Sequence, residues 1–392
     1  MNNLSNYLII LGFKSIRIAS GKRVISLSRV LFFLSLFLIF LSCTRSAGTS
    51  GDFTDSTPVF KVDPFWPKPL PNNWLIGRVA GIAVDSRDHI WIINRPGSLG
   101  WDERESMPPE RFSFVPAPPV IEFDPEGNLI QAWGGPGEGF EWPEEEHGLF
   151  IDHEDNIWIN GGGSGNYQAL KFSRDGQFIL AIGKPGETGG NNDTILLGYP
   201  AEFDVDPIEN EIYIADGYTN NRIIVFDAST GKYKRHWGAY GNKPDDFYNR
   251  RMLDLNQFNV PHAVRISDDG LVYLADRGNS RIQVFEKNGT FVFEEFFTKE
   301  HRGLGTAWDL DFSHDPEQKF IYMADGTNQH VWVLERKNLK VVDHFGHWGR
   351  NSGQFIWLHS IASDSKGNIY TAEVLTGKRV QKFSFLTNHE IK

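Results

Sequence analysis

Three histidines occupy the same position of a repeated sequence pattern, in every second repeat. They are His147 in EEHGLFID, His262 in VPHAVRIS and His359 in WLHSIASD. The other three repeats carry Ala80, Ala201 and Trp308 at this position. A neutral imidazole is a good zinc ligand, and three of them leave the fourth tetrahedral position open for water or substrate, as in catalytic zinc sites. The pattern therefore predicts a metal site, and the alternative is three core histidines bonded to backbone carbonyls.

The repeats predict how these histidines are positioned. Six segments share one frame at a spacing of about 45 to 65 residues, close to the period of propeller blades. Each segment holds two short strands with alternating apolar residues around a polar turn; the segments are 79–95, 146–161, 200–216, 261–276, 307–325 and 358–373. A third strand with an N-x-R-I-like start and a fourth strand follow. A sandwich or barrel is the alternative, but a four-stranded unit favours an all-β, six-bladed β-propeller.

A closed ring would bring the three imidazoles together. Alternate blades lie about 120° apart, and their innermost strands face a central channel. The last repeat ends near VQKFSFLTN, whereas the strand-like segment PVFKVDPFWP precedes the first repeat. Pairing of Val59–Val62 with the last blade would remove an exposed strand edge. We therefore predict a propeller over 59–392 that is closed by an N-terminal strand.

The amino terminus has the features of a targeting segment. A basic stretch over 14–29 precedes the apolar run Val30–Leu41, which is too short for a comfortable membrane span. Cys43, the only cysteine of the chain, follows Phe-Leu-Ser. This arrangement resembles a bacterial lipoprotein signal, although Phe40 stands where Leu is more usual. We predict a leader over 1–43 with lipidation of Cys43, and a linker over 44–58; an ordinary signal peptide or an uncleaved anchor is the alternative.

Composition agrees with an extracytoplasmic domain that is either membrane-anchored or secreted to the periplasm or beyond. The net charge of −11 includes the basic leader, so the mature propeller is more acidic still, and a nucleic-acid partner is not expected. Without a cysteine beyond the leader there is no internal disulfide. The 12 Trp and 30 Phe suit the gaps between blades. A membrane would be reached only through the N-terminal anchor, and the sequence carries no signal for an oligomeric state.

Several motifs together carry a family resemblance. From about Val79 to Lys382 the chain resembles the peptidyl-α-hydroxyglycine α-amidating lyases, within the wider group of NHL-repeat propellers. The zinc-binding histidine motifs of that family match HGL, VPH and LH at the three histidines. Its catalytic tyrosine motif matches ADGYTNNRI at Tyr218. Its two channel arginines match Arg95 in WIINRPGSLGWD and Arg277 in ADRGNSRI.

The resemblance implies a zinc-dependent lyase. Such an enzyme cleaves the N–C bond of a carbinolamide in a small peptide-like substrate and releases an amide and glyoxylate. Zinc would bind the substrate hydroxyl and ease the loss of its proton. Tyr218 would take that proton, and Arg95 and Arg277 would hold a substrate carboxylate. The structural alternatives are loop packing for Tyr218, pairing with Asp276 or another loop carboxylate for Arg277 and a turn role for Arg95.

Two arginines of the N-x-R-I strand starts, Arg222 and Arg281, are expected to be structural.

Departures from the family concern calcium and substrate. The family has Met-Pro-His-Asp around its third histidine, whereas this chain has Trp357, Leu358, His359 and Ser360. Ser360 supplies no carboxylate for the structural calcium of the family, although Ile82 and Leu149 lie where the family offers backbone carbonyls. Trp357 is larger than Met and would reshape the substrate pocket. The family's disulfide near the tyrosine is also absent.

A second class of function stays open from the sequence. The chain would then be a non-catalytic, lipid-anchored propeller that binds a peptide, a glycan or a protein. The absence of an attached hydroxylating domain favours this class, and fold alone does not separate the two. A calcium-dependent lactonase propeller would require Asp, Glu and Asn on the axis, where this chain has His.

Overall fold

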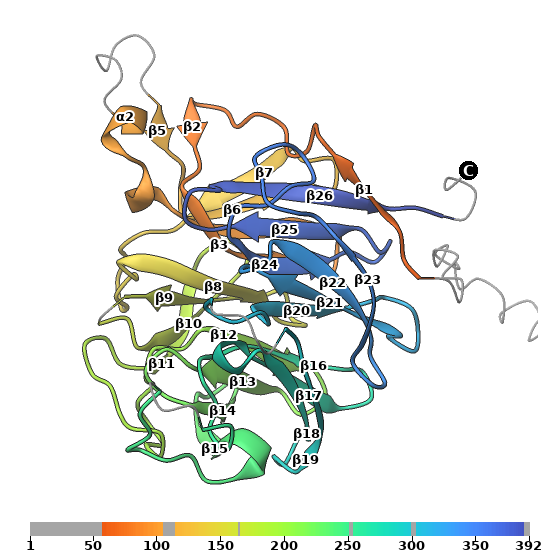
Figure 1. The fold of residues 1–392 in the computed structure, drawn as a ribbon. Helices are drawn as coiled ribbons and strands as arrows, with labels where there is room; N and C mark the ends of the chain where they lie inside the picture. The colour runs from red at the N-terminus through yellow and green to blue at the C-terminus, as the bar shows by residue number, and fades with distance from the viewer. Residues whose placement is uncertain (1–56, 105–113, 164, 251–253, 299–302, 388–392) are drawn as a thin grey trace, which may run out of the picture. The chain divides into compact units, whose positions relative to one another are not determined.

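The computed structural model describes residues 57–104, 114–163, 165–250, 254–298 and 303–387, so the predicted leader and Cys43 lie outside it. Six four-stranded antiparallel sheets follow one another along the chain (Figure 1). Their inner strands contact each other in the closed order β3, β8, β12, β16, β20, β24 and back to β3. The ring is therefore a six-bladed β-propeller, as predicted.

The first three blades have these strands. Blade 1 contains β3 (Arg78–Val84), β4 (Ile90–Arg95), β6 (Val120–Phe123) and β7 (Leu129–Trp133). Blade 2 contains β8 (Glu145–Ile151), β9 (Ile157–Gly162), β10 (Gln168–Phe172) and β11 (Phe178–Gly183). Blade 3 contains β12 (Glu202–Asp206), β13 (Glu211–Asp216), β14 (Arg222–Asp227) and β15 (Tyr233–Trp237).

The last three blades complete the ring. Blade 4 contains β16 (Pro261–Ile266), β17 (Leu271–Asp276), β18 (Arg281–Glu286) and β19 (Phe291–Phe296). Blade 5 contains β20 (Asp309–Phe312), β21 (Phe320–Asp325), β22 (His330–Glu335) and β23 (Lys340–Phe345). Blade 6 contains β24 (Leu358–Ser363), β25 (Ile369–Glu373), β26 (Arg379–Phe385) and β1 (Phe60–Asp63).

Short elements lie between these strands. A two-stranded parallel sheet joins β2 (Trp74–Leu75) to β5 (Val115–Pro116). The helical turns are η1 (Pro96–Ser98), α2 (Trp101–Arg104), η2 (Ala239–Gly241) and η3 (Arg277–Asn279). Among the described residues, no helix is long and apolar enough to cross a membrane.

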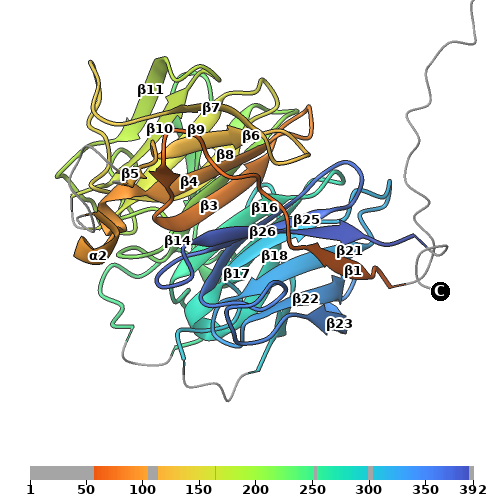
Figure 2. The same cartoon turned by 90° about the horizontal axis from the view of Figure 1, so that it is seen from above.

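The N-terminal strand closes the ring. β1 pairs antiparallel with β26, with Phe60 opposite Phe385 and Asp63 opposite Lys382. Figure 2 accordingly shows β1, near the red end of the colour range, beside β26, near the blue end. The paired segment begins one residue later than the predicted Val59–Val62, and this pairing covers an edge that would otherwise be open.

The core lies between blades rather than at one centre. Six buried apolar clusters each span two neighbouring blades. Between blades 1 and 2, for example, Trp91 and Val120 pack with Leu149 and Phe172. Stability is therefore a sum of similar interfaces, as in other repeat architectures.

Acidic side chains organise the turns between the first two strands of a blade. In blade 1, Asp85 Oδ1 accepts the backbone N–H of Arg87 at 2.8 Å, and Asp85 Oδ2 accepts the indole N–H of Trp91 at 3.0 Å. The same pair of contacts recurs at Asp152 with Trp158, and Asp364 accepts the hydroxyl of Tyr370 in blade 6. These turns explain why an Asp follows the inner strand in these repeats.

Candidate metal and catalytic site

The three histidines converge on the axis. His147 lies on β8, His262 on β16 and His359 on β24, and each is at least 95% buried. Their nearest ring nitrogens all lie within 4.8 Å of one another. The structure thus brings together the three positions that the repeat pattern aligned.

Each imidazole is oriented by a carbonyl of the next blade. Nδ1 of His147 lies 2.9 Å from the carbonyl oxygen of Ala201. Nδ1 of His262 lies 2.6 Å from that of Trp308, and Nδ1 of His359 lies 2.6 Å from that of Ala80. A carbonyl only accepts, so Nδ1 carries the proton and the Nε2 lone pair stays available. The hydrogen bonds to backbone carbonyls that were the alternative to metal binding are present, and they engage Nδ1 of each ring rather than Nε2.

The environment keeps the imidazoles neutral. Burial, followed by the nearby His359 and Arg95, lowers the pKa of His147 well below its ordinary value. Burial and then Arg277 do the same for His262. Burial lowers the pKa of His359 to about 3, with Arg95 and Arg277 as further causes. Neutral imidazole is the form that binds a metal.

The loop between β13 and β14 carries Tyr218 to this point. Asp216 ends β13, and Arg222 begins β14; their side chains form a buried ion pair of 2.9 Å that ties the two ends of the loop. Arg222 also donates to the carbonyls of Asn191 and Leu196. The expectation that Arg222 is structural is therefore confirmed.

The Tyr218 hydroxyl lies between two imidazoles. It is 2.8 Å from Nε2 of His147 and 2.9 Å from Nε2 of His262, and Nη1 of Arg277 donates to it at 3.2 Å. A phenol has one proton, so it satisfies only one of the two Nε2 acceptors. A cation shared by the three Nε2 atoms would satisfy all of them, and the donor set therefore fits a divalent metal with nitrogen ligands.

Arg277 faces the site rather than its neighbour in sequence. It lies on η3, stacks over Trp308 at 4.4 Å and over Tyr218 at 5.3 Å, and is 7% exposed. Asp276 instead pairs with Arg281 at 2.7 Å. The alternative of an Arg277–Asp276 pair is therefore wrong, and Arg281 has the expected structural role. Nothing among the described residues accepts a hydrogen bond from Nε of Arg277.

Arg95 approaches from the opposite side of His147. It ends β4, its Nε donates to the carbonyl of Glu146 at 2.5 Å, and its Nη1 lies 3.4 Å from a carboxylate oxygen of Glu145. Gly162 makes room for this approach, because a Cβ there would lie 3.3 Å from Arg95 and 2.6 Å from the Tyr199 hydroxyl. Arg95 is thus held by a backbone carbonyl and only loosely paired.

The sequence did not point to Arg250. Its guanidinium donates to the carbonyls of Gly217, Tyr218 and Asn220, and its Nε lies 2.8 Å from Oδ1 of Asn221. It therefore binds the backbone of the loop that presents the Tyr218 hydroxyl. No repeat motif includes this residue, and its partners precede it by about 30 positions along the chain.

The residues near the expected calcium position do not fit calcium. The Ser360 hydroxyl donates to Oδ2 of Asp309 at 2.7 Å and accepts the backbone N–H of Ile82 at 3.3 Å. It offers no carboxylate, and the cavity of about 140 Å³ lined by Ile82 and Leu149 is also lined by the cation Arg265 and by a single carboxylate, that of Asp311. Calcium prefers several anionic oxygens in one shell.

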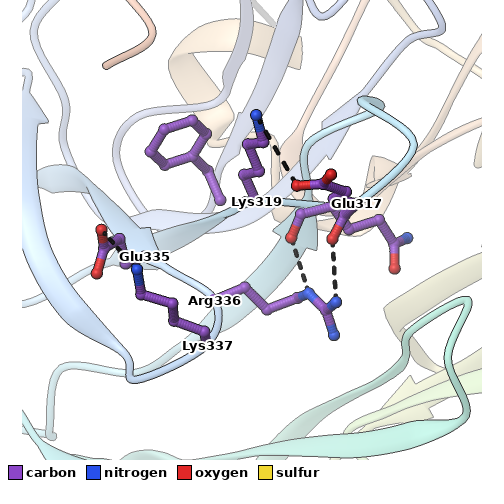
Figure 3. A pocket seen from close by; sticks show the side chains of 7 residues that line it. Glu317, Lys319, Glu335, Arg336 and Lys337 are labelled. Atoms are coloured by element: carbon purple, nitrogen blue, oxygen red, sulfur yellow. Dashed lines mark hydrogen bonds and ion pairs between the residues drawn. The ribbon is translucent and has the colours of Figure 1, made fainter. Parts of the chain in front are cut away.

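A larger cavity lies away from these residues. It measures about 440 Å³ and is formed by turns of blade 5 (Figure 3). Its basic side chains already have partners. Lys337 forms an ion pair with Glu335 at 3.5 Å, and Arg336 donates to the backbone carbonyls of Glu317 and Gln318. The axial site, with its converging lone pairs, is the stronger candidate for chemistry.

Comparisons with known proteins agree with this fold. The sequence pattern of the NHL repeat matches residues 258–285. A solved structure of a streptogramin B lyase superposes with a TM-score of 0.52 and 12% identity, covering 83% of this chain and 98% of that one. This chain is a six-bladed β-propeller, and its segment 258–285 matches the NHL repeat.

Its relatives in sequence fall into two groups. NHL repeat-containing protein 3 of Mus musculus is 27% identical over 345 residues, which are 83% of this chain and 84% of that protein. Peptidyl-alpha-hydroxyglycine alpha-amidating lyase 1 of Drosophila melanogaster is 27% identical over 344 residues, which are 81% of this chain and 58% of that protein. The chain is thus homologous both to amidating lyases and to a protein named for its repeats.

Proposed function

We propose that this protein is a zinc-dependent lyase that cleaves the N–C bond of a peptidyl-α-hydroxyglycine-type carbinolamide and yields an amide and glyoxylate. The observation that carries the proposal is the convergence of three neutral imidazoles on the Tyr218 hydroxyl, with Arg277 beside it. The homology to amidating lyases supports the same chemistry.

The proposed zinc ligands are Nε2 of His147, His262 and His359. Their Nδ1–H donors are engaged by carbonyls, so the three rings are held in the tautomer that a metal requires. When bound, zinc supplies a Lewis acid that makes the substrate hydroxyl more acidic.

Tyr218 would move the proton. Its oxygen, in the phenolate form, would accept the proton of the substrate hydroxyl while the electron pair of that O–H bond forms the carbonyl of glyoxylate. The pair of the N–C bond would remain on the amide nitrogen, which takes up the proton that Tyr218 returns. Nη1 of Arg277 donates to the same oxygen and would stabilise the negative charge on it before Tyr218 takes the proton and after Tyr218 returns it.

The two arginines would select an acidic substrate. Within the described residues, Nε of Arg277 has no acceptor, and the only carboxylate paired with Arg95 is that of the half-exposed Glu145, at 3.4 Å. A carboxylate that enters between them would gain charge-assisted hydrogen bonds. Trp357, whose ring lies 5.8 Å from that of Trp308, would then border the acyl part of the substrate.

Non-catalytic binding of a peptide, glycan or protein is the second candidate. It is favoured by the match to NHL repeat-containing protein 3, which spans most of both chains. In either case we propose that the propeller acts outside the cytoplasm, anchored through Cys43.

Glyoxylate release separates the two candidates. The purified zinc-loaded protein is incubated with α-hydroxyhippurate or a peptidyl α-hydroxyglycine, and glyoxylate is quantified with time. We expect zinc-dependent turnover that a chelator abolishes and added zinc restores. A zinc-loaded protein that releases no glyoxylate above the spontaneous rate would exclude the lyase and leave the binding function.

A further inference from the structure

A buried arginine lies on the same inner strand as one of the three histidines. Arg265 is on β16, three residues after His262, and is 7% exposed. Its Nη2 lies 2.8 Å from Oε1 of Glu202 and 2.9 Å from Oδ1 of Asp309, and its Nη1 donates to the carbonyl of Val264 at 2.9 Å. Glu202 belongs to blade 3 and Asp309 to blade 5, so one guanidinium of blade 4 joins three successive blades.

The same network extends around the ring. The second carboxylate oxygen of Asp309 accepts the Ser360 hydroxyl at 2.7 Å and the backbone N–H of Ile361 at 2.9 Å, both from blade 6. The Ser360 oxygen in turn accepts the backbone N–H of Ile82 in blade 1. Five of the six blades are thereby connected through side chains at one level of the axis.

Each of the two carboxylates directly follows, along the chain, a residue whose carbonyl orients one of the histidines. Glu202 follows Ala201, whose carbonyl orients His147, and Asp309 follows Trp308, whose carbonyl orients His262. The positions of both carboxylates therefore set the positions of two of the three orienting carbonyls.

The electrostatics make the guanidinium necessary. Burial raises the pKa of the Glu202 carboxyl well above its ordinary range, and Arg265 opposes this effect. Burial also raises the pKa of the nearby Asp204 to about 6, again opposed by Arg265. Without a cation, two or more buried carboxylates would face each other with no compensating charge.

We propose that Arg265 is a built-in cation of the propeller axis, which takes over the structural role of a calcium ion and holds the orienting carbonyls beneath the histidines. Arg265 and Asp311 line the same cavity as Ile82 and Leu149, so a positive charge already borders this cavity beside its one carboxylate. The ring therefore closes without calcium. This proposal concerns the fold and does not depend on the lyase reaction.

The first test is the response of stability to calcium. The wild-type protein is stripped of metals, and its Tm is measured with zinc alone, with calcium alone and with both. We expect calcium to leave the Tm unchanged with or without zinc. A rise of several degrees on addition of calcium would overturn the proposal.

The second test removes the cation. Arg265→Met keeps the length of the side chain but leaves Glu202 and Asp309 uncompensated, and we expect the Tm to fall by about 5 to 10 °C. Arg87→Met is the matched control, because Arg87 forms an exposed ion pair of 3.4 Å with Asp155 and should change the Tm by about 1 °C or less. An Arg265→Met protein as stable as this control would refute the proposal.

Two further measurements keep the test decisive. If Arg265→Met does not fold, the double variant Arg265→Met/Glu202→Gln removes both the guanidinium and one carboxylate charge. It should recover a folded protein, because Asp309 keeps its bonds to Ser360 and Ile361. A double variant that is no more stable than the single variant contradicts the charge argument. In folded Arg265→Met, zinc affinity measured by chelator competition should fall about tenfold or more. This last readout rests on the proposed zinc site, whereas the Tm readouts do not.

Discussion

Replacing Tyr218 with Phe would test the proposed proton transfer most directly. The ring should stay in place, because it stacks on Tyr199 with centroids 4.5 Å apart, meets His147 edge-on at 5.1 Å and lies beneath Arg277. The substitution therefore deletes one oxygen atom and the three polar contacts that it makes, and leaves the three imidazoles in position.

The expected effect follows from what that oxygen would do. Loss of a positioned general base lowers turnover by about a hundredfold or more, which corresponds to about 2.7 kcal/mol or more of transition-state stabilisation. Binding of the substrate carboxylate depends on Arg95 and Arg277, so KM should change little while kcat falls. Zinc content should stay near that of the wild type, because the hydroxyl is not one of the three proposed ligands.

The assay measures glyoxylate release, zinc per chain and Tm on the same protein preparation. Tyr199→Phe is the matched control: burial raises the pKa of Tyr199 to about 12, so this residue stays a neutral phenol and is not the base. Its hydroxyl accepts the backbone N–H of Gly163, whereas the Tyr218 hydroxyl is the one that lies against Nε2 of His147 and His262. A zinc-loaded Tyr218→Phe protein with wild-type kcat would refute the assigned role.

Four other predictions follow from the structure. Alanine in place of any one of the three channel histidines should remove the expected single zinc per chain, as measured by elemental analysis; unchanged metal in all three variants would contradict the site. Arg250→Met should release the loop that carries Tyr218, so kcat should fall while KM changes less, and Arg250→Lys should keep part of the wild-type kcat. Variants with a lowered Tm but an unchanged kcat would show that Arg250 has only a structural role. Asp204→Asn should be more stable than the wild type, and this difference should grow between about pH 4 and 6. The reason is that the pKa of Asp204 is about 6 in the folded chain and lower in the unfolded chain, so ionisation of Asp204 favours unfolding over that range and its cost stays constant at higher pH. A difference in Tm that is independent of pH would count against this burial effect. Cys43→Ser should abolish incorporation of a labelled fatty acid, and persistent labelling would argue against lipidation at this residue.

Local patterns were sufficient to predict the blades and the convergence of the three histidines. Alternating strands, the Asp turns and the N-x-R-I starts all act within a single repeat, and the ion pairs Asp216–Arg222 and Asp276–Arg281 span only six and five positions. The alignment of repeats placed the three histidines at one level of the ring. Ring closure was predictable because the last repeat lacked a strand and the segment before the first repeat supplied one.

Contacts between blades were not predictable in this way. Arg265 reaches a carboxylate 63 positions before it and another 44 positions after it, and no motif relates these residues. Arg250 lies in a connection without repeat pattern, and only the folded chain brings it to the carbonyl of Tyr218. From the sequence, the argument against calcium rested on Ser360 alone, whereas Arg265, the cation that we propose for this level, stands on another blade.

The alternation of histidines with other residues has a physical reason that the structure supplies. Each even-numbered blade presents an imidazole, and the next odd-numbered blade presents, at the equivalent position, the carbonyl that orients it: Ala201, Trp308 and Ala80. Trp308 shows that even a bulky side chain is accepted at such a position, so the property that these three positions share is the carbonyl. Six blades therefore divide into three that present an imidazole and three that orient one, and this division would let a ring of nearly equivalent repeats build a site with three nitrogen ligands. Tyr218 and Arg277 lie beside the imidazoles, so the same propeller face would carry both the metal and the proton transfer.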